Sequence, residues 1–150
     1  MEHFIQVDIQ VVRPEFYPEL PSHATPGSAG CDLRVCIDEA RPLWPNQAVR
    51  LPLGIKVALP QGWAMVLIPR SGLGSRGLVL GNLVGLIDPD YRGEIEASLW
   101  NRTDEVIRLE PGERVAQAVF LPYARVVWNP LEELDATERG EGGHGSTGVK

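Results

Sequence analysis

The residues of this chain best suited to chemistry lie in short polar segments, and the last of these is the most informative. After Arg139 the sequence reads Gly-Glu-Gly-Gly-His-Gly-Ser-Thr-Gly. Closely spaced glycines let backbone N–H groups and Ser/Thr hydroxyls converge on phosphate oxygens, which predicts a phosphate clamp. Taken alone, the segment fits a flexible terminus equally well. It is not a Walker A loop, because Val149 stands where that motif requires lysine.

Two more polar segments interrupt apolar runs. Residues 69–74, Pro-Arg-Ser-Gly-Leu-Gly, place a cation and a hydroxyl at a sharp turn, and turn chemistry explains the glycines without requiring Arg70. Residues 85–94 contain two aspartates, Asp88 and Asp90, and Tyr91 in a hairpin-like connection. A carboxylate near a phosphate can orient and deprotonate water, and a tyrosine ring can pack on a sugar and exclude a bulkier one. Asp-Pro-Asp is also ordinary turn chemistry.

The elements that must position these segments are predicted to be β-strands. From Ile5 to Val11 apolar and polar residues alternate, the pattern of a half-buried strand. Further strands are predicted at residues 31–37, 48–58, 64–68, 93–100, 106–109, 114–121 and 126–128. Turn signals such as Pro60-Gln61-Gly62 separate them. No apolar period of 3.6 residues lasts three turns, so the only predicted helix is a short turn at residues 71–76.

Many short strands at regular spacing predict an all-β fold, a distorted jelly-roll sandwich or barrel. We expect residues 1–134 to form this core. Residues 135–150 have almost nothing to bury and many glycines, which predicts a flexible C-terminal arm.

Composition restricts the class of protein. The chain has 150 residues, a hydrophobic share of 43% and a net charge of −6, which fits one globular domain. The absence of a basic stripe argues against a nucleic-acid partner, and no apolar run approaches the length of a membrane span. The first residues lack a signal-peptide pattern, so we expect a cytoplasmic protein with no membrane partner.

The cysteines predict neither a disulfide nor a zinc site. Cys31 and Cys36 fall in one predicted strand, where extended chain holds their Cα atoms too far apart for a bridge. We therefore expect two reduced thiols. No histidine-cysteine cluster has zinc spacing.

Five motifs in fixed order resemble those of the trimeric dUTPase family. They are PGSAGCDL (26–33), PRSGLG (69–74), GNLVGLIDPDYRGEI (81–95), RVAQAVF (114–120) and RGEGGHGSTG (139–148). The resemblance runs from the first strand to the tail. It implies a Mg²⁺-dependent dUTP diphosphatase, which hydrolyses dUTP to dUMP and pyrophosphate by water attack on the α-phosphorus. It also implies a homotrimer with active sites assembled between subunits, and a role in limiting uracil incorporation into DNA and supplying dUMP for thymidylate synthesis.

The resemblance assigns the nucleoside end of the substrate to the third motif. Asp88 corresponds to the general base that activates water. Tyr91 corresponds to the tyrosine beneath deoxyribose, where a 2′-hydroxyl has no space. Asn82 and the backbone of Gly85, Leu86 and Ile87 correspond to the reader of uracil.

The other motifs are assigned to the triphosphate. Arg70, Ser71 and Gly72 correspond to residues facing the α- and β-phosphates, and Gln117 to a further triphosphate contact. Asp32 corresponds to the aspartate that approaches Mg²⁺ through water. Arg139 corresponds to the ligand of the γ-phosphate, and Gly145, Ser146 and Thr147 complete the clamp.

The chain departs from the family pattern at His144, where the family usually places a phenylalanine that stacks on uracil. An imidazole can also stack, or its charge change near neutral pH can make the lid pH-sensitive, and the sequence leaves both readings open. Two other functions remain as alternatives, a dCTP deaminase on the same fold and a non-catalytic nucleotide sensor. The glycine-rich tail argues against the first, and the intact Asp88, Tyr91 and Arg139 argue against the second.

Overall fold

The computed structural model describes residues 4–145 and residue 148. Within these residues the chain forms short strands, one α-helix and one turn of 3₁₀ helix. The elements are β1 (Asp8–Val11), η1 (Pro14–Phe16), β2 (Cys31–Arg34), β3 (Arg41–Leu43), β4 (Ala48–Pro52), β5 (Ile55–Ala58), β6 (Trp63–Pro69), α1 (Ser71–Ser75), β7 (Leu78–Leu80), β8 (Gly85–Ile87), β9 (Glu96–Asn101), β10 (Ile107–Leu109) and β11 (Arg114–Pro122). The predicted all-β fold is confirmed, and α1 lies where the helical turn was expected.

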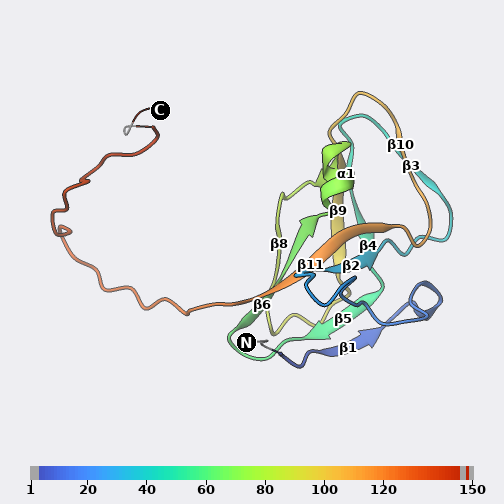
Figure 1. Cartoon of the computed structure of the whole chain (residues 1–150), viewed down its shortest axis with the longest axis horizontal. Coiled ribbons are helices and arrows are strands. Elements are labelled where there is room, and N and C mark those ends of the chain that lie inside the picture. The colour runs from blue at the N-terminus through green and yellow to red at the C-terminus, as the bar shows by residue number, and fades with distance from the viewer. Residues whose placement is uncertain (1–3, 146–147, 149–150) are drawn as a thin grey trace.

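The strands of the described chain pair into antiparallel sheets (Figure 1). The largest has the order β2-β11-β6-β8, a second has the order β4-β9-β7, and two smaller sheets pair β1 with β5 and β10 with β3. In the largest sheet, Gln117 of β11 lies opposite Asp32 on one side and Ile68 on the other. Residues opposite one another share a face, so this sheet joins three segments that are far apart in the sequence.

Alternation along the strands separates a buried face from a polar face. In β2, Cys31 and Leu33 are buried, whereas Asp32 and Arg34 are partly exposed. Fully buried apolar side chains come from most strands and include Leu33, Leu43, Leu53, Ile55, Met65, Leu67, Leu78, Leu80, Ile95, Leu99 and Leu109. Burying one such side chain is worth about 1.5–3 kcal/mol. Core packing therefore fixes which residues of β2 face the solvent.

Two strand predictions need correction. The run at residues 48–58 breaks at Gly54, whose φ of +73° is left-handed, and β4 and β5 join different sheets. A Cβ at residue 54 would lie 2.5 Å from Cys36 Sγ, so the break requires glycine. Residues 126–128 form no strand, because no segment of the described chain pairs with them.

The prediction that residues 85–94 form a hairpin-like connection is also wrong, because the strands on either side, β8 and β9, do not pair with each other. β7 pairs with β9 and β8 pairs with β6, so the segment crosses from one sheet to another. The strands β3, β7 and β8 were not predicted as separate elements. Each has three residues, which is too short to show a period of two.

The chain leaves the body after β11 as a long extended arm. Figure 1 shows this arm, coloured orange to red, stretching away from the sheets. All residues from 121 to 141 are exposed, with Val127 93% and Trp128 86% exposed. No helix among the described residues is long and apolar enough to cross a membrane.

Candidate functional site

The first cluster of predicted site residues surrounds Asp32. Its Oδ1 accepts a hydrogen bond from Arg70 Nε at 2.9 Å, and its Oδ2 lies 3.3 Å from Arg114 Nη1. Arg70 also donates to the Arg114 carbonyl at 3.3 Å. The Asp32 side chain is 23% exposed. Two guanidiniums around one partly buried carboxylate leave a net positive group, which suits phosphate oxygens.

Strand ends bring this cluster together. Asp32 lies in β2, Arg114 begins β11, and Arg70 follows the end of β6 directly. Ser71 and Gly72 begin α1 beside Arg70, and both are exposed. Because β11 lies between β2 and β6, the sheet places residues from three of the recognised motifs on one surface.

Gln117 of β11 contacts both the last residue of β6 and the residue before β2. Its Nε2 donates a hydrogen bond to the Pro69 carbonyl at 3.1 Å. A Cβ at Gly30 would overlap Gln117 Oε1 and lie 3.2 Å from Cδ. Glycine at residue 30 therefore lets the Gln117 amide lie against β2 while it holds the turn that carries Arg70.

The second cluster follows β7 and β8. Asn82 is exposed in the turn between these strands, and Leu83 adopts a φ of 64°. A Cβ at Gly85 would lie 3.1 Å from Leu67 Cβ and 3.6 Å from Asn82 Nδ2. Close packing of the Gly85 backbone on β6 thus holds Asn82 beside the start of β8. Leu86 is exposed and Ile87 is partly exposed.

Asp88 and Tyr91 lie in the loop after β8. The Tyr91 amide donates to the Asp88 carbonyl at 3.2 Å, and the Tyr91 hydroxyl donates to the Glu94 carbonyl at 3.1 Å. Asp88 is exposed and lines a hollow of about 610 Å³ with Asp90, Arg92 and Arg125, among others. The loop therefore presents a free carboxylate and a ring that is fixed by its hydroxyl.

The two clusters lie at opposite ends of β6. Ile87 pairs with Met65, which places Asp88 near the start of β6, whereas Arg70 follows its end. Asp32 and Asp88 also lie at opposite edges of the sheet, since Asp32 is in β2 and Asp88 follows β8 in the order β2-β11-β6-β8. Strand spacing of 4.8 Å and a rise of 3.3 Å per residue give a separation of roughly 20 Å between these two residues. A general base must be within hydrogen-bond reach of its proton, so one copy of the chain does not bring the predicted site together.

The tail is remote from both clusters. Arg139 Nε donates to the Gly142 carbonyl at 2.7 Å, and the Gly140 amide donates to the Thr137 carbonyl at 3.1 Å. His144 is exposed with a φ of 49°, and Gly145 has a φ of 85°. Ser146 and Thr147 lie outside the described residues. The hydrogen bonds described for residues 137–148 stay within the tail.

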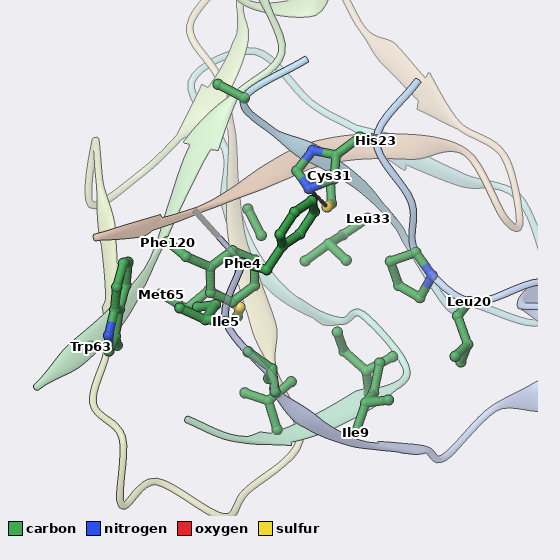
Figure 2. Close-up of a pocket in the computed structure, with 16 residues that line it drawn as sticks. Phe4, Ile5, Ile9, Leu20, His23, Cys31, Leu33, Trp63, Met65 and Phe120 are labelled. Carbon is green, nitrogen blue, oxygen red and sulfur yellow. Dashed lines mark hydrogen bonds between the residues drawn. The ribbon is translucent and has the colours of Figure 1, made fainter. Parts of the chain in front are cut away.

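A separate apolar cavity of about 460 Å³ contains none of the predicted site residues. Figure 2 shows side chains that line it, among them Phe4, Ile5, Trp63, Met65 and Phe120. His23 and Cys31 lie at its edge, with Nε2 and Sγ 3.4 Å apart. Burial, followed by the nearby charge of Asp32, raises the pKa of the Cys31 thiol. The cavity wall is suited to apolar side chains rather than to a triphosphate.

Comparison with known proteins supplies the family. The family model described as dUTPase matches residues 17–148. The deoxyuridine 5'-triphosphate nucleotidohydrolase of Albidiferax ferrireducens is 48% identical over 146 residues, covering 96% of this chain and 98% of that protein. The chain belongs to the dUTPase family. It is thus a hydrolase of dUTP, as the five motifs predict.

Solved dUTPases share the fold. The dUTPase of Staphylococcus bacteriophage 80alpha, solved with dUPNHPP, matches with a TM-score of 0.83 at 26% identity, covering 96% of this chain and 99% of that one. The dUTPase of Streptococcus mutans matches with a TM-score of 0.70 at 35% identity, covering 80% of this chain and 98% of that one. The predicted jelly roll is confirmed by these matches.

Arg114 is a member of the first cluster that sequence reasoning left without a role. It opens the motif that contains Gln117, and its guanidinium reaches Asp32 across the sheet. A cation three residues before a polar residue in an otherwise apolar strand is the signal that was available. That signal is weak, because the β-bulge between Arg114 and Ala116 changes the register on which a face assignment depends.

Proposed function

We propose that this member of the dUTPase family forms dUMP and pyrophosphate by attack of water on the α-phosphorus, with Asp88 as general base. The support is that Asp88 is exposed at the edge of a polar hollow. Its carboxylate has no ion pair among the described residues. A carboxylate with free lone pairs can orient a water and accept its proton.

The loop that carries Asp88 also recognises the nucleoside in this proposal. Tyr91 packs under deoxyribose and leaves no space for a 2′-hydroxyl. Asn82 and the backbone of residues 85–87 pair with the edge of uracil. Backbone groups suit this task because packing of Gly85 on Leu67 fixes their direction.

The triphosphate is held by the cluster around Asp32 and by the tail. Arg70, Ser71, Gly72 and Gln117 face the α- and β-phosphates. Arg139 binds the γ-phosphate, where a guanidinium adds charge and bidentate geometry. Gly145, Ser146 and Thr147 donate hydrogen bonds to the phosphates, and His144 covers the uracil.

Mg²⁺ fits the donor set of this cluster if the substrate supplies most of its ligands. The described residues contain no group of three or more His, Cys, Asp or Glu side chains that could form a cage, and both Asp32 oxygens already meet guanidiniums. Mg²⁺ usually keeps several waters and takes phosphate oxygens as ligands. Asp32 would hold the ion through water, and the bound ion would neutralise and orient the triphosphate.

Separation of the two clusters supports a homotrimer with active sites between subunits. Asp88 and Asp32 lie roughly 20 Å apart in one chain by strand geometry, yet both must act on one nucleotide. A second copy that places its Asp88 loop against the Asp32 cluster satisfies this requirement. The arm then closes the site from a third copy, which accords with its departure from its own body (Figure 1).

Apolar residues of the arm also support assembly. Val126, Val127 and Trp128 are exposed in the single chain, and residues 126–128 have strand-forming side chains without a partner strand. The apolar cavity of another copy provides a surface of matching character (Figure 2). We therefore place residues 1–134 in the assembled core and assign lid function to residues 135–150.

A cytoplasmic location and a role in limiting uracil in DNA complete the proposal.

Mixing two inactive variants tests the site and its assembly together. Asp88→Asn removes the base and Arg70→Ala removes a phosphate ligand, so each homotrimer should release little pyrophosphate from dUTP. After unfolding and refolding together, about one quarter of sites should draw an intact Asp88 loop and an intact Arg70 cluster from different chains. Pyrophosphate release should then recover to a comparable fraction of the wild-type rate.

The matched control is the double variant Asp88→Asn/Arg70→Ala refolded with either single variant, which cannot regenerate an intact site. Recovery limited to the first mixture supports sites between subunits. No recovery, with a trimer confirmed by its mass in solution, contradicts them. Ammonia release from dCTP in the wild type would instead favour the deaminase alternative.

A further inference from the structure

The ring of Tyr91 is folded back across the backbone of Gly93. Its hydroxyl donates to the Glu94 carbonyl at 3.1 Å. A Cβ built at Gly93 would overlap the Tyr91 hydroxyl oxygen, and it would lie 2.5 Å from Cζ and 3.0 Å from Cε2. Real Cβ atoms do not approach heavy atoms this closely, so any side chain at residue 93 forces the tyrosine ring to move.

Backbone conformation does not explain the glycine. The positive-φ glycines of the described chain do not include Gly93, so its φ lies outside the left-handed region that favours glycine. The nearest three heavy atoms to a Cβ at this position all belong to Tyr91. Glycine at residue 93 is therefore required by the position of one side chain.

We infer that Gly93 is a specificity-determining residue, which excludes ribonucleotides by fixing the ring of Tyr91. The inference rests on the proposed role of Tyr91 beneath deoxyribose. Space left by the missing side chain lets the hydroxyl end of the ring lie against residue 93 and reach the Glu94 carbonyl. The hydroxyl bond to Glu94 then holds the ring in that place, where it closes the position of a 2′-hydroxyl.

Alanine at residue 93 rotates the ring away from the loop and breaks the bond to Glu94. Space opens where a 2′-hydroxyl would lie, so UTP becomes a better substrate. The three heavy atoms nearest to a Cβ at residue 93 belong to Tyr91 and none to the Asp88 carboxylate. Gly93→Ala should therefore change discrimination between dUTP and UTP more than it changes kcat for dUTP.

A double-mutant cycle tests the inference by measuring kcat/KM for dUTP and UTP. The variants are Gly93→Ala, Tyr91→Ala and the double variant, with Tyr91→Phe as the control that keeps the ring but loses the bond to Glu94. We expect both alanine variants to lower the dUTP/UTP ratio by about tenfold or more, in the range of discrimination by shape. Without the ring, Gly93→Ala has nothing to displace, so the double variant should match Tyr91→Ala.

The outcomes separate the inference from the proposed function. An unchanged ratio in Tyr91→Ala would remove the role of Tyr91 and the inference with it. A reduced ratio in Tyr91→Ala with a native ratio in Gly93→Ala would overturn the inference alone. Additive effects in the double variant would overturn it too, because they would show that residue 93 acts by another route. Thermal melting is measured alongside, and loss of the folded state in Gly93→Ala would show that the ring cannot move as inferred.

Discussion

Asp32 and Asp88 have different surroundings, which accords with the different roles proposed for them. Both oxygens of Asp32 meet guanidiniums, at 2.9 Å and 3.3 Å, so its lone pairs are engaged and its position is fixed. Asp88 is exposed, and no ion pair holds it among the described residues. A base must have a lone pair available for the proton. The geometry therefore favours Asp88 as the base and Asp32 as a fixed negative group near the phosphates.

Asp88→Asn should lower kcat for dUTP by about 10²–10⁴-fold, the usual range for loss of a general base. Asparagine has nearly the same size, so affinity for a non-hydrolysable dUTP analogue should change little. Single-turnover kinetics and analogue binding measure the two quantities separately. Near-native turnover in this variant would assign the base elsewhere.

Among the strands, Asn101 at the end of β9 is the one polar side chain that is fully buried in the described core. Its Nδ2 donates to the carbonyls of Leu43 and Glu105 at 2.9 Å and 2.6 Å, and its Oδ1 accepts from the Thr103 amide at 3.0 Å and the Thr103 hydroxyl at 2.8 Å. One side chain thus joins β9 to β3 and to the turn before β10. Full satisfaction of its groups allows this amide to be buried.

Asn101→Ala should lower the free energy of unfolding by about 3 kcal/mol, because it empties a buried site and removes the hydrogen bonds of Asn101 to the Leu43 and Glu105 carbonyls and from the Thr103 amide. Urea denaturation measures the change. Asp135→Ala is the matched control, since Asp135 is exposed and lies beyond the residues assigned to the core, and surface changes of this kind stay within about 0.5 kcal/mol. Equal effects of the two substitutions would contradict the structural role of Asn101.

Deletion of residues 139–150 should separate turnover from stability. Arg139 and its neighbours make no hydrogen bond to the β-core in the described chain, so the melting temperature should hold. Turnover of dUTP should fall by about 10²-fold or more, because the γ-phosphate loses its ligand and the lid is gone. A lost melting transition, or retained activity, would show that the tail has another function.

At the scale of the molecule, buried acids couple stability to pH. Burial raises the pKa of Tyr17 from 10.0 to about 12 and the pKa of Cys36 from 9.0 to about 11. Tyr17 donates its hydroxyl to the Leu53 carbonyl at 2.8 Å, and both side chains pack near Gly54. Both groups are neutral in the folded state, so ionisation of either at high pH should destabilise the core near Gly54.

Titration of Tyr17 and Cys36 should leave the free energy of unfolding unchanged below pH 9 and should lower it from pH 9 to pH 12. In that window the unfolded chain loses its protons before the folded chain does, which favours unfolding. A difference of two in pKa corresponds to on the order of 3 kcal/mol for one group. Urea denaturation under reducing conditions at several pH values measures the fall. Tyr17→Phe should flatten the dependence above pH 10, and an unchanged slope would contradict the assignment.

Much of this architecture is determined locally by the sequence. In β2 apolar and polar residues alternate, because a strand with one face in the core places apolar residues at every second position. β6 and β11 are marked instead by apolar runs between turn signals. Glycine and proline mark the turns, and ordered motifs identify the family and its chemistry. The composition of residues 135–150, which cannot bury enough apolar surface, predicts only the last part of the exposed arm.

Tertiary structure decided what depends on pairing between distant segments. The break at Gly54 became visible only once Cys36 and Tyr17 were packed against it. Residues 126–128 have the composition of a strand, but a strand forms only where a neighbour pairs with it. Arg114 belongs to the cluster around Asp32 because β11 pairs with β2. No local sequence pattern specifies which strands pair.

The tertiary structure also determines that the Asp32 cluster and the Asp88 loop lie far apart in one chain. The sequence places all the catalytic residue types in one chain, and the order of its motifs says nothing of their distances. Sheet order β2-β11-β6-β8 puts the Asp32 cluster and the Asp88 loop at opposite ends of β6. Antiparallel pairing forces this result, because the segments that follow two paired antiparallel strands emerge at opposite ends of the sheet.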